Sequence, residues 1–323
     1  MIFSTVVRGD ELQARLLLFL KNKVFLPIDT LTFVKEGVWI ATGKETWLIK
    51  LFSSKKKLER QIEFTKRLYD LQFRETYTFH PLHQYQLLPF DGKYVGVMSY
   101  LGDKKQEGTY SSPCFRQQVL SLLKKFHETT FYLVPEFQSQ LPFFHQLEKW
   151  KERYTEFKMW LPLIQQWVPS DFLYLYQQWA EYALEYMEDH EDFFVQKPWS
   201  IIHGDVAHHN FLLTENHLYM IDFDLIAIAP SVIDYLQFCH RIIPNIHGNW
   251  DELHGHKGIS SFLNQEPFKV ALLYPTDIFR EWNRFFKKDY TYQQRMFSSL
   301  IYMTIRSFPW RFQLNQHLLN MIK

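Results

Sequence analysis

The sequence predicts an α+β protein in which a small antiparallel sheet comes first and a mainly helical part follows. Three strand-like segments separated by short turns lie at residues 31–34, 37–42 and 45–52. A fourth strand is predicted within residues 92–102, where a glycine marks a break after an apolar run. Beyond this point apolar residues recur at helical spacing over long stretches, which indicates that helices make up most of the remaining chain.

Two helices are expected in the N-terminal part. The first covers residues 10–21, because leucines recur at helical spacing after an acidic start. The second covers residues 55–71, and its apolar stripe consists of Leu58, Ile62, Phe64, Thr65, Leu68 and Leu71. A polar, turn-rich stretch at residues 104–112 then marks a boundary. We therefore predict an N-terminal domain of residues 1–102 and a C-terminal domain of residues 103–323.

The C-terminal part is expected to be built from helices. Ser112 and Pro113 open one of them, since proline is tolerated in the first turn, and His127 near its end is expected to be structural. Further helical patterns cover residues 141–194 (divided near Pro162 and Pro169), 232–241 and 258–323. These last two regions carry aromatic or apolar stripes that would pack against the rest of the domain.

The composition limits the class of protein. With 46% hydrophobic residues and only 11 glycines, the chain favours a packed core over disorder. A net charge of +1 argues against a nucleic-acid partner. The apolar runs fall short of the roughly 18 residues of a membrane helix, and the charged N-terminal residues are unlike a secretory signal. Two distant cysteines, Cys114 and Cys239, suit a reducing compartment, so we expect a cytoplasmic protein without a membrane partner.

The densest group of polar residues surrounds a predicted β-hairpin. Two short apolar runs, at residues 211–213 and 218–221, flank a polar turn. Polar residues lie on both sides of it: His203, Gly204, Asp205 and Asn210 before, and Asp222 and Asp224 after. Phosphoryl transfer uses such a set, because one carboxylate positions the attacking hydroxyl while an amide and a second carboxylate hold magnesium.

The order and spacing of these residues resemble the catalytic loop and metal-binding motif of the aminoglycoside phosphotransferase and choline kinase family. That family has a protein-kinase-like fold and phosphorylates small molecules. More narrowly, the chain resembles the CotS-type spore-coat kinase-like proteins of endospore-forming bacteria in the stretch IIHGDVAHHNFLL…YMIDFD, which suggests possible spore association. The resemblance implies a two-lobed fold, with a small antiparallel-sheet lobe, a mainly helical large lobe, and ATP and Mg²⁺ between them.

By this resemblance, Asp205 would be the catalytic base, and Asn210 and Asp222 would be the magnesium ligands. Three further residues would support them: His203 in the loop, Asp224 beside the metal, and Asp234, which braces the loop. Only 11 residues separate Asp222 from Asp234, which leaves no room for the long activation segment on which protein kinases dock peptides. This spacing favours a small-molecule acceptor.

The resemblance also assigns residues to the nucleotide. Lys50 is bracketed by apolar residues on a predicted strand and would need an anionic partner if buried. In the family a strand lysine contacts the nucleotide phosphates and pairs with a helix glutamate, here Glu63 or Glu59, with Glu63 at the more usual distance. Met98 and Tyr100 would lie at the hinge that contacts adenine. Each of these residues also has a plain alternative as a core or solvent-facing side chain.

Two departures from the family pattern keep other functions open. Gly37 stands alone where a glycine-rich phosphate loop is expected, so a catalytically silent kinase fold, used for binding or in the spore coat, is the alternative. His203, His208 and His209 also permit a metal-dependent phosphohydrolase, although this leaves Asn210 and Asp222 unexplained. The main expectation is an ATP- and Mg²⁺-dependent kinase that phosphorylates a hydroxyl of a small molecule, whose identity and oligomeric state the sequence leaves undefined.

Overall fold

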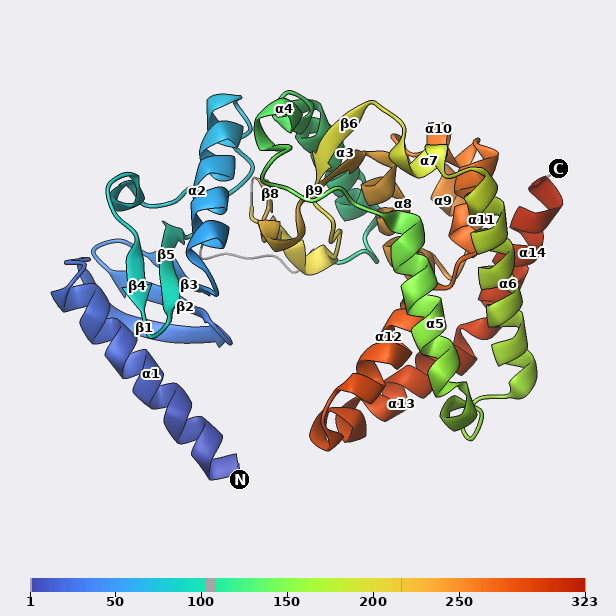
Figure 1. Cartoon of the computed structure of the whole chain (residues 1–323), viewed down its shortest axis with the longest axis horizontal. Coiled ribbons are helices and arrows are strands. Elements are labelled where there is room, and N and C mark those ends of the chain that lie inside the picture. Colours follow the sequence, from blue (N-terminus) through green and yellow to red (C-terminus); the bar gives the residue numbers. More distant parts are fainter. Residues whose placement is uncertain (1, 103–107, 216, 323) are drawn as a thin grey trace. The chain divides into compact units, whose positions relative to one another are not determined.

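The computed structural model describes residues 2–102, 108–215 and 217–322, with side chains from residue 11 onward (Figure 1). The chain forms two units. The first consists of Met1–Glu107 and Phe211–Asp224, and the second consists of Gly108–Asn210 and Leu225–Lys323. The first unit holds a five-stranded sheet and the second is mostly helical, so the fold is α+β as predicted.

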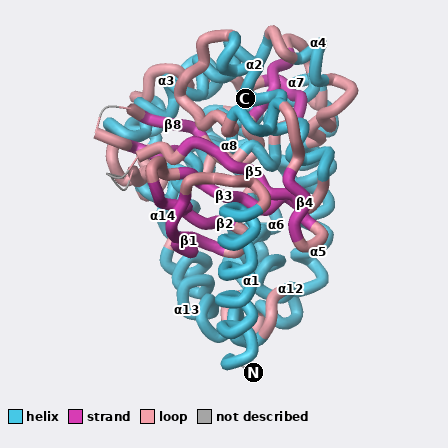
Figure 2. Tube along the Cα trace, turned by 90° about the vertical axis from the view of Figure 1, so that its left-hand side faces the viewer, coloured by secondary structure: helices cyan, strands magenta, loops and turns pink. Residues whose placement is uncertain are grey.

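The first unit is built on an antiparallel sheet with the strand order β1-β2-β3-β5-β4 (Figure 2). The strands are β1 (Ile28–Lys35), β2 (Val38–Gly43), β3 (Trp47–Phe52), β4 (Leu88–Phe90) and β5 (Lys93–Ser99). The four predicted strands are present. The fifth, β4, was not predicted because three residues are too short to show alternation; its proline is tolerated because β4 lies at the sheet edge.

Helices α1 (Ile2–Asn22) and α2 (Lys55–Asp70) complete this part of the fold. Leu16 and Leu20 of α1 pack with Ile49 of β3 in the apolar core on one face of the sheet. Since side chains alternate along a strand, Lys50 lies on the opposite face of β3. This alternation separates the charged side chain from the core.

Two details of these helices differ from the sequence prediction. Helix α1 begins at Ile2 instead of residue 10, so the acidic residues predicted to open it lie inside the helix. Leu71, predicted to be buried, is 38% exposed because α2 ends at Asp70 and Leu71 is its C-terminal cap.

The predicted hairpin is formed by β7 (Phe211–Leu213) and β8 (Leu218–Met220). It belongs to the first unit although it lies far along the chain: the Met220 amide donates to the Glu75 carbonyl at 2.8 Å. Immediately after it, the fully buried ring of Phe223 packs against Phe64 of α2 and Tyr77, with ring centroids 5.2 and 5.7 Å apart. These contacts anchor the aspartates on either side of Phe223.

The second unit combines helices with a two-stranded antiparallel sheet, β6 (Trp199–Ile202) and β9 (Ala227–Pro230). Its helices are α3 (Pro113–Phe131), α4 (Val134–Phe137), α5 (Gln146–Ile164), α6 (Ser170–Asp189), α7 (Asp192–Val195), α8 (Val232–Ile242), α9 (Trp250–His254), α10 (Ser260–Leu263), α11 (Glu266–Leu273), α12 (Thr276–Lys287), α13 (Tyr290–Arg306) and α14 (Phe308–Met321). Pro162 does not divide α5 as predicted but lies in its last turn.

Aromatic side chains pack α5 against the segment that leads into α12. Trp150 of α5 stacks on Tyr274, the C-terminal cap of α11 in the turn before α12, with ring centroids 4.3 Å apart. Tyr274 also donates its hydroxyl to the Trp150 carbonyl at 2.7 Å. Of the helices that the structure describes, none combines the length and the apolar composition needed to span a bilayer.

Candidate active site

Asp234 of α8 holds the loop that follows β6. Its fully buried carboxylate accepts hydrogen bonds from the His203 amide at 2.7 Å, the Gly204 amide at 3.0 Å and His127 Nε2 at 2.9 Å. Burial alone would raise the pKa of Asp234, but the hydrogen bond and charge of His127, with those of His203, outweigh it and lower the pKa. The carboxylate therefore stays ionised and fixes the loop backbone.

Glycine is required in this loop. Gly204 has a φ of +77°, and a Cβ at this position would lie 2.4 Å from the Leu225 carbonyl oxygen. Tyr110 donates its hydroxyl to the Val206 carbonyl at 3.1 Å, and the Asp205 amide donates to His203 Nδ1 at 3.3 Å. The backbone on both sides of Asp205 is thus held by hydrogen bonds.

The Asp205 side chain is 31% exposed and oriented by two neighbours. Arg241 Nη2 of α8 lies 2.8 Å from Asp205 Oδ1. Asn210 Nδ2 donates to the Asp205 carbonyl at 2.9 Å and lies 3.4 Å from Asp205 Oδ2. No residue in the described part of the chain donates a hydrogen bond to the Asn210 side-chain oxygen, which leaves that oxygen open to a ligand.

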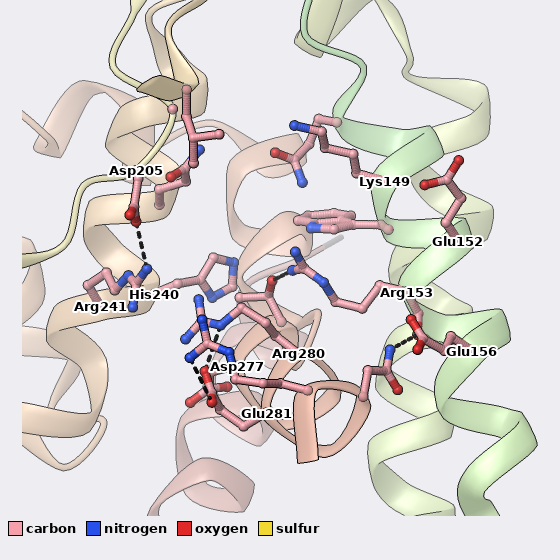
Figure 3. Close-up of a pocket in the computed structure, with 18 of the residues that line it drawn as sticks. Lys149, Glu152, Arg153, Glu156, Asp205, His240, Arg241, Asp277, Arg280 and Glu281 are labelled. Carbon is pink, nitrogen blue, oxygen red and sulfur yellow. Dashed lines mark hydrogen bonds and ion pairs between the residues drawn. The ribbon is translucent and has the colours of Figure 1, made fainter. Parts of the chain in front are cut away.

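A cavity of about 860 Å³ lies beside Asp205 within the second unit. Figure 3 shows that its lining side chains come from the loop of Asp205 and from helices α5, α8 and α12. Charged residues dominate the drawn set, including Arg153 of α5, Arg241 of α8 and Arg280 of α12. The half-exposed carboxylate of Asp205 therefore faces a space large enough for a small molecule.

The first unit contains a second charged group. Lys50 Nζ lies 3.0 Å from Asp222 Oδ1 and 2.9 Å from Asp224 Oδ1, and its side chain is only 17% exposed. Lys35, at the end of β1, is 3.8 Å from Asp222 Oδ2. Asp222 has a φ of +69°, a left-handed conformation that is costly for a residue with a side chain. The anionic partners that a buried Lys50 was expected to need are these two aspartates.

Gln61 of α2 links this group to the helix. Its Nε2 donates to Asp224 Oδ1 at 2.5 Å, and its Oε1 accepts from the Tyr77 hydroxyl at 2.9 Å. Burial, with the charges of Asp222 and Asp224, raises the pKa of Tyr77 well above its ordinary value, so this hydroxyl remains a donor. The two aspartates are thereby tied to both β3 and α2.

The other residues predicted to serve the nucleotide lie on α2 and on or just after β5. Glu59 pairs with Lys55 at 3.4 Å on the outer face of α2, and Glu63 is exposed on the same helix. Gln61 is an α2 residue that reaches Asp224, and pairing of Lys50 with either glutamate stays a prediction. Met98 is buried in β5, and Tyr100 follows that strand half-buried.

Three residues in the groups around Asp205 and Lys50 were not predicted from the sequence. Gln61 interrupts the predicted apolar stripe of α2 and is buried, a pattern that signals a polar contact in the interior. Arg241 lies seven residues after Asp234, two helical turns along the same face. Lys35 carried no comparable signal, because a lysine at a turn is ordinarily solvated.

The histidines near the loop do not form a metal centre. His203 is buried, whereas His208 and His209 are exposed. Among the described side chains (residues 11–102, 108–215 and 217–322), no three His, Cys, Asp or Glu residues are grouped to hold a metal ion. The geometry therefore gives no support to the metal-dependent phosphohydrolase.

A family model described as "Phosphotransferase enzyme family" matches residues 35–261, more than two thirds of the chain. The chain belongs to the phosphotransferase enzyme family. The family predicted from the sequence motif is thus confirmed, whereas membership of the spore-coat subgroup stays a prediction. None of the curated protein sequences matches the chain significantly.

Solved structures of this family share the fold. An aminoglycoside phosphotransferase from Alicyclobacillus acidocaldarius is 15% identical, with a TM-score of 0.65 over 92% of this chain and 93% of that one. A spectinomycin phosphotransferase, solved with ADP and spectinomycin, is 17% identical (TM-score 0.62; 95% and 98% covered). A choline kinase from Streptococcus pneumoniae is 12% identical (TM-score 0.51; 96% and 98% covered). These likenesses confirm the predicted protein-kinase-like fold.

Proposed function

We propose that this member of the family transfers the γ-phosphoryl group of ATP, in the presence of Mg²⁺, to a hydroxyl group of a small molecule. The observation that carries the proposal is the position of Asp205, a half-exposed carboxylate on the wall of a cavity of about 860 Å³. Pockets for small molecules commonly have volumes of about 300–1,000 Å³. Between Asp222 and Asp234 the chain is occupied by a short turn, β9 and the start of α8, so no docking segment for a peptide intervenes.

Asp205 would orient the acceptor hydroxyl and receive its proton. As the acceptor oxygen bonds to the γ-phosphorus, the bond from that phosphorus to the β,γ-bridging oxygen breaks and ADP leaves. Arg241 and the Asn210 amide hold the Asp205 carboxylate in one orientation, which reduces the reorganisation needed in the transition state.

Asn210 and Asp222 would hold the magnesium ion. Both offer oxygen atoms, the ligands that Mg²⁺ prefers. The hydrogen bonds of the Asn210 side chain are made by its amide nitrogen, so its oxygen is available to a ligand. The ion would neutralise charge on the nucleotide phosphates. Asp224, which shares Lys50 with Asp222, would support the ligand carboxylate.

The nucleotide would be bound mainly by residues 1–102, and the acceptor by residues 103–323. Lys50 and Lys35 supply positive charge for the phosphates, and Met98 and Tyr100 would contact the base. Glu63 could pair with Lys50 once nucleotide is bound. The ADP complex of the spectinomycin phosphotransferase supports the use of an adenine nucleotide by a chain of this fold.

The Asp205→Asn variant tests this proposal. We expect the variant to keep its melting temperature and its ATP affinity, while turnover falls by about 10² or more, the usual scale of positioned proton transfer. A metabolite screen for ATP consumption would first supply an acceptor. If a stable Asp205→Asn protein phosphorylates that acceptor at the wild-type rate, the catalytic role of Asp205 is refuted.

A catalytically silent kinase fold is the second candidate, favoured by the turn between β1 and β2. Only Glu36 and Gly37 join the two strands, so a single glycine with a φ of +75° stands where a glycine-rich loop would cover the phosphates. Titration calorimetry with ATP, with and without Mg²⁺, separates the candidates. Mg²⁺-dependent binding followed by turnover supports the kinase, and the absence of binding at millimolar ATP supports the silent fold.

A further inference from the structure

Of the half-buried charged side chains that line the cavity beside Asp205 in the described part of the chain, all but Arg153 form an ion pair. The half-buried carboxylates on its wall each have a basic partner, in the pairs Asp205–Arg241 (2.8 Å), Glu281–Arg280 (2.8 Å), Glu156–Lys287 (2.7 Å) and Asp277–Arg311 (2.5 Å). Arg153 is different. It is half-buried, its guanidinium donates to the Thr276 hydroxyl, and no carboxylate among the described residues lies within ion-pair distance.

Arg153 also lies close to other positive charges. Figure 3 shows Arg153 reaching from α5 into the space that Arg280 of α12 and Arg241 of α8 border. Burial lowers the pKa of Arg153, and the charges of Arg280 and Arg241 also lower it, whereas Tyr274 and the more distant carboxylate of Asp277 act in the opposite direction. His240 in the same wall has its pKa lowered to about 4 by burial, so it is neutral at pH 7 and the arginines supply the positive charge.

A guanidinium that is partly desolvated, without a carboxylate and next to like charges, is electrostatically unfavourable until an anion binds. Its planar set of donors matches the oxygens of a carboxylate or phosphate, with which arginine forms bidentate hydrogen bonds. A cationic molecule in the same place would add to the repulsion.

We propose that the acceptor molecule carries an anionic group, a phosphate or a carboxylate, which Arg153 and Arg280 bind while the hydroxyl of the acceptor meets Asp205. This inference rests on the proposed function and narrows its substrate class. An anionic acceptor differs in charge from polycationic and quaternary-ammonium alcohols, which Arg153 and Arg280 would repel.

The first experiment measures binding to the full chain by titration calorimetry, with four three-carbon probes that differ in charge. Glycerol 3-phosphate and glycerate are anionic, glycerol is neutral, and 3-amino-1,2-propanediol is cationic. We expect one or both anions to bind, and the comparison between them distinguishes phosphate from carboxylate. If neither anion binds at millimolar concentration, or if the cationic probe binds most tightly, the proposal is refuted.

Matched variants locate the anion. We expect Arg153→Gln to weaken binding of the better anionic probe by about 10- to 100-fold, the usual worth of charge-assisted hydrogen bonds, and Arg153→Lys to retain part of it. Lys50→Gln, in the first unit, should leave this affinity unchanged. If the probe loses affinity in Lys50→Gln but not in Arg153→Gln, the anion binds where the nucleotide phosphates are expected, and the proposal is overturned. If Arg153→Gln has a markedly lower melting temperature than wild type, Arg280→Gln is used for the same binding test.

ATP binding on the same preparations separates the two proposals. Wild type and Arg153→Gln should bind ATP with the same affinity, because Arg153 belongs to the acceptor cavity. A chain that binds the anionic probe through Arg153 but never binds ATP would refute the kinase while retaining the anion site. Binding of ATP without any Arg153-dependent anion binding would refute the anion site alone and leave the kinase in place.

Discussion

Asp222 and Asp234 both follow the predicted hairpin in the sequence, but their side chains are held in different ways. Asp234 is fully buried and accepts hydrogen bonds from two backbone amides and one buried histidine. The Asp222 side chain is 28% exposed and lies 3.0 Å from Lys50 Nζ and 3.8 Å from Lys35 Nζ. The first carboxylate is shielded from solvent, whereas the second is partly exposed.

This difference separates a residue that builds the site from one that can bind a ligand. Removing one member of a buried ion pair commonly costs about 3–5 kcal/mol, because its partners are left unsatisfied in the interior. Ion pairs at the surface contribute about 0–1 kcal/mol, because water replaces either partner. Under the proposed function, the partly exposed Asp222 would exchange a lysine for the metal ion, while the buried Asp234 would keep its hydrogen bonds.

The largest expected effect belongs to the buried side of the comparison. Asp234→Ala should lower the free energy of unfolding by about 3–5 kcal/mol, since it leaves the amides of His203 and Gly204 and the ring of His127 without their acceptor. Urea unfolding followed by circular dichroism measures this. The matched Asp222→Ala variant should lose less, because Asp222 is partly exposed and Lys50 keeps Asp224 as an ionic partner. If both variants lose the same free energy of unfolding, the proposed difference between Asp234 and Asp222 is wrong.

An intermediate effect is expected on ligand binding. Asp222→Asn should weaken Mg²⁺-dependent nucleotide binding by about 10- to 100-fold, because a neutral amide cannot replace a carboxylate beside a hard cation. Calorimetric titration of ATP at fixed Mg²⁺ measures the change, with Asp224→Asn as the control that should respond less. A larger loss in Asp224→Asn would exchange the roles of the two aspartates.

The smallest effect is a change of slope in acid. The pKa of Asp234 is lower in the folded chain than its ordinary value of 3.8, so its stabilisation is present above about pH 4 and is lost as the pH falls through the folded pKa. One such proton changes stability by at most about 1.4 kcal/mol per pH unit. Unfolding free energies measured below pH 4 should therefore fall less steeply in Asp234→Asn than in wild type.

Two buried histidines act in a higher pH range and must be separated from this effect. Burial lowers the pKa of His83 and of His240 to about 4. The unfolded chain takes up their protons from about pH 6.5 downward, so their contribution is already lost between about pH 6.5 and 4. His83→Gln should flatten the stability profile in that range and leave the slope below pH 4 unchanged.

Local patterns predicted much of the fold and of the charged groups. Alternation and turns identified four strands of the sheet, and two apolar runs identified the hairpin, because these features depend on neighbouring residues. The motif identified two pairs of site residues, Asp205 with Asn210 and Asp222 with Asp224. The structure places the members of each pair in one unit. Such contacts follow from short separations along the chain.

The cavity could not be predicted in this way. Its wall joins Arg153 of α5 to Arg280 of α12, and these helices meet only through tertiary packing such as the Trp150–Tyr274 stack. The sequence indicated helices with aromatic stripes in both regions but not which faces come together. The Lys50–Asp224 contact, between residues far apart in the sequence, was equally hidden.

The place of the hairpin in the first unit also affects synthesis of the protein. Residues Phe211–Asp224 belong with Met1–Glu107, yet about half of the second unit is translated between them. A ribosome adds roughly 5–20 residues per second, so on the order of ten seconds passes before the nascent N-terminal sheet meets the strands and aspartates that complete its unit. A message truncated after codon 107 would yield a polypeptide that carries Lys50 without either of its acidic partners.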